Sequence, residues 1–132
     1  MEYLSSQRLG RLSTVNASNE PRVVPVAFRY NEDLDTIDIG GHNLARSKKF
    51  RDAKRNGRAA FVVGDVLPTW QARGIEVRGR AEVFSEGGNE VNPGFEAALA
   101  RIHPARIVGW GIDTDAYRQS SRSISQETFG EE

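Results

Sequence analysis

The stretch TIDIGGHNLARSKKFRDAKRNGR, residues 36–58, joins a short apolar alternation, a glycine pair and a strongly basic run. Its first five residues predict a strand with Ile37 and Ile39 on the inner face, because side chains alternate between the two faces of a strand. The glycine pair permits a sharp turn or a close approach of the backbone to a ligand. The basic run predicts a helix that ends at about Arg55, where an Asn-Gly pair stops it.

The predicted helix is unusually cationic for a chain that balances 18 basic against 18 acidic residues. Against the single acid Asp52, the segment 46–58 carries seven cations: Arg46, Lys48, Lys49, Arg51, Lys54, Arg55 and Arg58. Ser47 or Asn43 can cap the helix. With Ser47 as the cap, two lysines enter the first turn, where cations oppose the helix macrodipole. A bound phosphate would remove that mismatch. A solvated basic face, the usual meaning of a charge run, is the alternative, and both interpretations are open at this point.

Composition limits the protein class. A chain of 132 residues fits one domain with one sizeable core. Without cysteine, no disulfide or thiolate metal site is possible. Neutral net charge gives no indication of wholesale binding to nucleic acid or to acidic membranes. The N-terminus lacks the apolar run of a signal peptide, and no stretch reaches transmembrane length, so we expect a soluble cytoplasmic protein.

Several chemical motifs are missing. No GxGxxG fingerprint follows a strand, and no phosphate loop of the GxxxxGK type occurs. The two histidines, His42 and His103, are 61 positions apart and share no metal-ligand spacing, so we expect no metal site. His103 fits a packed or backbone-bonded histidine. His42 follows the glycine pair and would face any ligand bound there. Trp70 and Trp110 fit core or interface positions better than ligand platforms.

The strand over 22–30 has two distinct faces. One face carries Val24, Val26, Phe28 and Tyr30, and the other carries Val23, Pro25, Ala27 and Arg29. Because Pro25 cannot donate to a ladder, this strand is predicted to lie at an edge or to contain a bulge. The face of small residues that ends in Arg29 suits the floor of a flat ligand. A barrel wall packed on neighbouring backbone explains the same pattern.

The remaining segments follow outward from this region. Further strands are predicted over 10–15, 59–66 and 74–85, with a final apolar segment at 107–112. A short helix is predicted within 1–8, turns at 16–21 and 31–35, a loop at 67–73, and a mobile glycine-rich insertion at 87–94. Residues 95–103 fit a helix or a strand, ended by Pro104. Together these predict a mainly β chain: a small antiparallel barrel over 1–112, with a polar tail over 113–132.

The ordered set of segments resembles a known superfamily. The set consists of PxVxPVxFRYNxDxDTIDIGG from residue 21, SKKFR from 47, RNGRAAFVV from 55, GIEVRGRAEV from 74 and RIHPARIVGWG from 101. It is similar to the pyridoxamine 5′-phosphate oxidase-like split β-barrels, and more narrowly to their coenzyme F-420 (deazaflavin)-dependent branch. The resemblance covers about residues 3–112.

The resemblance implies a homodimer with a cofactor in each groove between protomers. Ser47, Lys48 and Lys49, helped by Arg46 or Arg51, would hold the cofactor phosphate. Along the ring system would lie Val24, Pro25, Val26, Ala27, Ile39, Gly40, Gly41 and His42. From the second copy, Trp70, Arg73 and Arg78 would complete the groove.

The implied activity is reduction of a small unsaturated acceptor by hydride from the reduced deazaflavin, with no covalent nucleophile required. Arg29, His42 or Arg78 would polarise the acceptor, and the residues do not rank them. FMN is the nearest rival cofactor, because its phosphate needs the same turn. A non-catalytic cofactor-binding protein is a further alternative. A nucleic-acid-binding barrel is disfavoured, because its stacking aromatics are missing from the predicted exposed faces.

Overall fold

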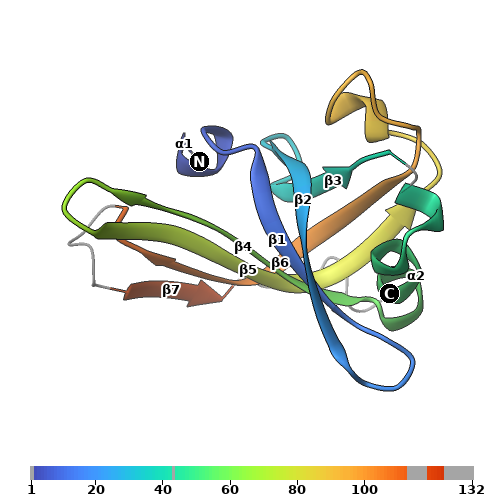
Figure 1. The fold of residues 1–132 in the computed structure, drawn as a ribbon, viewed down its shortest axis with the longest axis horizontal. Coiled ribbons are helices and arrows are strands. Elements are labelled where there is room, and N and C mark those ends of the chain that lie inside the picture. The colour runs from blue at the N-terminus through green and yellow to red at the C-terminus, as the bar shows by residue number, and fades with distance from the viewer. Residues whose placement is uncertain (1, 43, 113–118, 124–132) are drawn as a thin grey trace.

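A single antiparallel sheet closes on itself in the computed structural model, which describes residues 2–42, 44–112 and 119–123. The elements are α1 (Glu2–Ser5), β1 (Leu9–Val15), β2 (Pro21–Asn31), β3 (Thr36–Gly40), η1 (Leu44–Arg46), α2 (Lys48–Asn56), β4 (Arg58–Leu67), β5 (Gln71–Phe84), η2 (Gly88–Glu90), β6 (Leu99–Trp110) and β7 (Gln119–Ser123). Strand order is β3-β2-β1-β4-β5-β6-β7, and β3 also pairs with β6. Six strands therefore form the barrel, and β7 extends it beyond β6 (Figure 1). The predicted mainly β barrel is confirmed.

The barrel core comes from the inward faces of the strands. Ile37 and Ile39 are buried, as predicted, and Val26 and Phe28 of β2 also point inward. The Phe28 ring packs edge-on against Phe61 of β4, with ring centroids 4.8 Å apart. The alternation of apolar residues thus identified the inner face of each of these strands.

The first half of β2 is an edge. β3 pairs with β2 only between Ala27 and Asn31, where Ala27 lies opposite Gly40. The part of β2 before Ala27 pairs with β1 alone among the described residues, and Pro25 lies in this part. The edge position predicted for Pro25 is confirmed, because no second ladder there requires its missing N–H.

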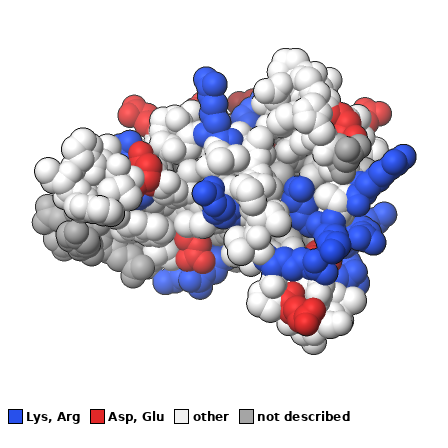
Figure 2. Space-filling view, in the orientation of Figure 1, with Lys and Arg blue, Asp and Glu red and all other residues white. Residues whose placement is uncertain are grey.

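The capping of α2 is local and follows the sequence. Ser47 is the N-cap, and its hydroxyl oxygen accepts a hydrogen bond from the Phe50 N–H at 3.2 Å. Gly57 ends the helix with φ 74°, a conformation that favours glycine. The inner side of α2 buries Asp52, whose carboxylate pairs with Arg22 of β2 at 3.2 Å. Figure 2 shows Lys and Arg side chains gathered over α2, at the right of the molecule.

Two predicted boundaries are wrong. Residues 71–73 of the predicted 67–73 loop belong to β5, because β4 and β5 pair out to Leu67 and Gln71. Residues 99–103 are strand, and Pro104 does not end it. The register shifts beside Gly79, which lies opposite Pro104, and Ala105 is left without a β5 partner. Proline is tolerated at such a bulge because no ladder hydrogen bond needs its N–H.

The glycine-rich insertion packs against the barrel, although it is predicted above to be mobile. The Gly88 N–H donates to the Ala97 carbonyl oxygen at 2.8 Å. Phe95 covers Gly40, where an added Cβ would lie 2.9 Å from its ring. The predicted polar tail also contributes structure, because residues 119–123 form β7 on β6. Its other residues lie outside the described ranges.

No helix within the described ranges is long and apolar enough to cross a membrane.

Tyr3 attaches the N-terminal helix α1 to strands β4 and β5. Its hydroxyl donates to Asp65 Oδ1 at 2.9 Å, and the Arg73 guanidinium lies 5.0 Å from the centroid of its ring. Burial, together with the Asp65 carboxylate, raises the pKa of Tyr3 to about 12. The neutral phenol is therefore the form that the folded state favours.

We expect Tyr3 to ionise near pH 12, later in a titration than an ordinary phenol. The stabilisation from this shift is present below about pH 10 and is lost as pH rises through the folded pKa. Spectrophotometric titration of phenolate absorbance measures it. Tyr3→Phe is expected to remove the late step, and a late step that persists in this variant would contradict the assignment.

Candidate functional site

The end of β3 and the free half of β2 form one continuous strip. Because Ala27 lies opposite Gly40, residues 24–26 continue past the end of β3. The chain then leaves β3 through Gly41 and enters α2 at Lys48. The strip thus brings together the parts of β2, β3 and α2 that the resemblance assigns to the cofactor. We call residues 40–51 the glycine–helix turn.

Within the strip, side chains differ in what they offer to a ligand. Val26 and Ile39 are buried in the core and leave only backbone for a ligand, whereas Pro25 is exposed and Val24 is half-buried. A Cβ added at Gly41 would meet no described atom within 4 Å. The backbone at Gly41 is therefore open to a flat group. The backbone at Gly40, in contrast, is covered by the insertion and by Phe95.

The cations of the turn are uncompensated. Arg46, Lys48 and Arg51 are exposed, and Lys49 is half-buried. Among the described residues none of these four forms an ion pair, in contrast to Arg55, which contacts Asp52 at 2.9 Å. Ser47 donates its hydroxyl to the Leu44 carbonyl oxygen at 2.7 Å. Four cations without an ion pair among the described residues surround a helix N-terminus and create a local positive field. Such a field favours a bound phosphate over a solvated face that binds no ligand. His42 is exposed beside them, with its ring 5.3 Å from that of Phe95.

Trp70, Arg73 and Arg78 lie elsewhere in the protomer. Trp70 is at the tip of the β4–β5 hairpin, at the opposite end of the molecule from α2 (Figure 1). Arg73 forms two hydrogen bonds to Asp65, at 2.8 and 2.9 Å, and Arg78 forms two to Glu76, both at 2.9 Å. Within one protomer the structure does not bring these three residues to the turn, and their role across a dimer stays a prediction.

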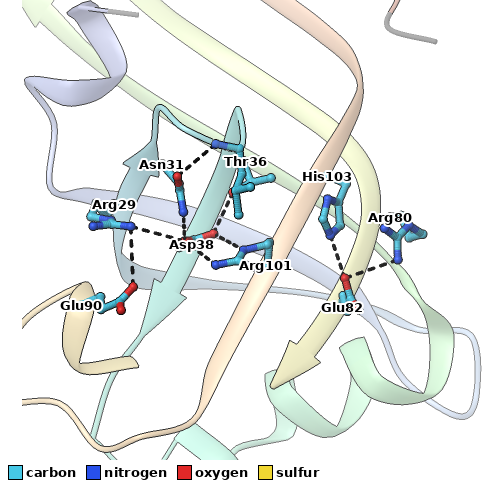
Figure 3. A network of polar contacts seen from close by, with 10 residues as sticks. Arg29, Asn31, Thr36, Asp38, Arg80, Glu82, Glu90, Arg101 and His103 are labelled. Carbon is cyan, nitrogen blue, oxygen red and sulfur yellow. Dashed lines mark hydrogen bonds and ion pairs between the residues drawn. The ribbon is translucent and has the colours of Figure 1, made fainter. Parts of the chain in front are cut away.

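A buried ion-pair network beside the strip was missed from the sequence (Figure 3). Asp38 of β3 is 2% exposed and accepts two hydrogen bonds from Arg101 of β6, at 2.8 and 3.0 Å. Asn31 and Thr36 each donate another at 2.9 Å. Burial raises the pKa of Asp38, but these donors outweigh burial and hold the pKa below its ordinary value. The sequence feature that could have indicated this network is the position of Asp38 between Ile37 and Ile39 in a predicted strand.

A second polar cluster joins β5 and β6. His103 Nε2 lies 2.8 Å from Glu82 Oε1, which also contacts Arg80 at 3.6 Å (Figure 3). Burial lowers the pKa of His103, and the Glu82 contact opposes that shift only in part. The packed position predicted for His103 is confirmed. In the described ranges, no three His, Asp or Glu side chains gather as a metal site would require.

Two of the grooves that described residues line lie on the barrel. The first, about 420 Å³, lies between α1, β2 and the insertion, and includes Ala27, Arg29 and Phe95. We call it the α1–β2 groove. The second, about 650 Å³, lies over β1, β4 and β5 and includes Arg58, Arg78 and Arg80.

Comparison with known proteins agrees with this architecture. A family model described as "Pyridoxamine 5′-phosphate oxidase" matches residues 1–125. A curated relative from Streptomyces rimosus subsp. rimosus, 5a,11a-dehydrotetracycline/5a,11a-dehydrooxytetracycline reductase, is 44% identical over 131 residues, which are 97% of this chain and 92% of the relative.

Solved structures share the fold at lower identity. A pyridoxamine 5′-phosphate oxidase-related, FMN-binding protein of Nostoc punctiforme is 14% identical with a TM-score of 0.62, covering 94% of this chain and 90% of its own. An FAD-binding protein of Mycobacterium smegmatis is 21% identical with a TM-score of 0.63, covering 82% and 88%. The barrel described above is thus found in proteins that bind flavins.

Proposed function

This chain belongs to the pyridoxamine 5′-phosphate oxidase family, and we propose that it is a reductase that uses reduced coenzyme F-420 to reduce a conjugated enone. The observation that carries the proposal is the glycine–helix turn, where four uncompensated cations adjoin an open backbone at Gly41. The 44% identical relative is named as a reductase of dehydrotetracyclines, which supports both the reductive direction and the class of acceptor.

Different residues of the turn and the strip bind different parts of the cofactor. Ser47, Lys48 and Lys49 hold the phosphate of the cofactor, with Arg46 or Arg51 as helpers. The backbone of residues 24–27 and 39–41 supports the flat ring. The anionic tail of F-420 is attracted by the same cations through space, which favours F-420 over FMN. The cofactor supplies hydride when bound, and the protein supplies orientation, charge and exclusion of water.

The reaction balances as a conjugate reduction. Hydride adds to the β-carbon of the enone, electron density moves to the carbonyl oxygen, and a solvent proton then adds to the α-carbon. The oxidised cofactor is the second product. No protein side chain changes its covalent state, which agrees with a chain that has no cysteine and no nucleophile motif.

A homodimer completes the proposed site. On the β4–β5 hairpin, Trp70 is 79% exposed and Val66 is 56% exposed. Exposed apolar groups of this size favour contact with a partner. In the dimer, Trp70, Arg73 and Arg78 of the second copy close the cofactor groove. Sedimentation equilibrium is expected to give twice the subunit mass, and a single-subunit mass would contradict this part of the proposal.

FMN is the second candidate cofactor, because the fold is shared with a protein described as FMN-binding. Absorbance titration of the protein with F-420 and with FMN separates the two. We expect F-420 to bind more tightly, and the loaded protein to oxidise reduced F-420 with 5a,11a-dehydrotetracycline as the probe acceptor. Tight FMN binding without F-420 binding would reverse the assignment. F-420 binding without turnover across enone, quinone and tetrapyrrole probes would indicate a non-catalytic cofactor carrier.

A further inference from the structure

The α1–β2 groove begins where the proposed cofactor strip ends. Ala27 lines the groove and also lies opposite Gly40, the last residue of β3. Phe95 lines the groove from the other side and covers Gly40. A ring lying along residues 24–27 would therefore present one end to this groove. At about 420 Å³, the groove is of a size that takes small ligands.

Arg29 lines this groove and is held, among the described residues, only by long contacts to Asp38 and Glu90. The Asp38 carboxylate already accepts four hydrogen bonds between 2.8 and 3.0 Å from other residues. Arg29 Nη2 stays 3.9 Å from Asp38 and 4.0 Å from Glu90, whose side chain is 66% exposed (Figure 3). Arg29 Nε is buried, with no hydrogen-bond partner among the described residues.

An arginine in this situation has donors ready for a ligand oxygen. The Arg29 side chain is 42% exposed and lines the groove, so a ligand there meets the terminal N–H groups of its guanidinium, although Nε itself is buried. Both contacts of Nη2 are longer than a good charged hydrogen bond. Asp38 and Glu90 position the Arg29 guanidinium, but neither forms a short hydrogen bond with it.

We propose that the α1–β2 groove is the acceptor site and that Arg29 binds the carbonyl oxygen of the enone. This inference rests on the proposed function. As hydride adds to the β-carbon, negative charge develops on that oxygen, and Arg29 stabilises the resulting enolate until a solvent proton reaches the α-carbon. A fixed donor aimed at developing charge lowers the barrier because it needs no reorganisation during the step.

Arg29→Gln keeps a hydrogen-bond donor and removes the charge. We expect it to slow single-turnover oxidation of bound, reduced F-420 by 5a,11a-dehydrotetracycline about 100-fold, and to weaken binding of this probe to the cofactor-free protein. Affinity for F-420 is expected to be unchanged. Arg29→Lys is expected to recover part of the rate. Arg106→Gln, an exposed arginine on β6 outside this groove, serves as the matched control.

Glu90→Gln separates a binding role from a structural one. Removing the Glu90 carboxylate takes away negative charge 4.0 Å from Arg29 Nη2, so probe binding is expected to hold or to tighten. If Arg29 were merely structural, both Arg29→Gln and Glu90→Gln would lower the melting temperature and neither would change probe affinity.

The two proposals fail in distinguishable ways. If the wild-type protein binds the probe but does not bind F-420, the proposed function fails. The probe affinity of Arg29→Gln then still shows whether the α1–β2 groove binds the acceptor. Unchanged probe affinity and rate in Arg29→Gln, or a wild-type protein that does not bind the probe, would overturn the acceptor site.

Discussion

Replacing Asp38 by asparagine is expected to lower the free energy of unfolding by about 3–5 kcal/mol, the usual cost of removing one partner of a buried ion pair. The reason is the position of Arg101, whose side chain is only 16% exposed and whose guanidinium makes both short bonds to Asp38. Without the carboxylate, a charge remains in a place where water reaches it poorly. Urea unfolding measures the change.

A paired substitution is the control for this prediction. Asp38→Leu combined with Arg101→Leu removes both charges, and its cost is expected to be well below the sum of the two single changes. A loss under about 1 kcal/mol in Asp38→Asn would show that the ion pair is not needed for stability.

The same substitution changes the response to acid. Because the donors hold the pKa of Asp38 below its ordinary value, its contribution is present above about pH 4 and is lost as pH falls through the folded pKa. Asp38→Asn is therefore expected to flatten the acid limb of the stability curve below about pH 4.

Lys49→Ala is expected to weaken F-420 binding by about 1–3 kcal/mol, the range for losing a charged hydrogen bond. Lys49 follows the Ser47 cap in the first turn of α2 and makes no ion pair within the described residues, so removing it costs the fold almost nothing. Isothermal titration calorimetry measures affinity, and thermal unfolding checks stability.

Lys54→Ala is the matched control on the same helix. Lys54 is exposed, carries the same charge and lies in the last turn, away from the glycine–helix turn. Equal losses from both variants would indicate a diffuse electrostatic effect. Unaltered affinity in Lys49→Ala would mean that the basic run is only a solvated helix face.

Local signals predicted most of the fold. The strand at 36–40 and the Ser47 and Gly57 caps follow from a few neighbouring residues, and each is confirmed. The strand through Pro104 was predicted wrongly, because the bulge that accepts proline depends on Gly79, 25 positions earlier in the sequence. Boundaries set by a distant partner strand leave no local trace.

The candidate site was predictable only in part. The resemblance assigned the strip and the turn, and β-sheet register brings them together in space. The Asp38–Arg101 pair joins residues 63 positions apart, and Arg29 contacts both Asp38 and Glu90, which the sequence does not place near each other. The covering of Gly40 by Phe95 was likewise invisible, because Phe95 directly follows the glycine-rich segment 87–94, which shows no alternation from which packing can be inferred.

A crystal structure of the protein with F-420 tests the central claim most directly. We predict the cofactor phosphate within hydrogen-bond distance of Ser47, Lys48 and Lys49, with the ring along residues 24–27. An empty glycine–helix turn, with the cofactor absent or bound at another surface, would contradict the claim.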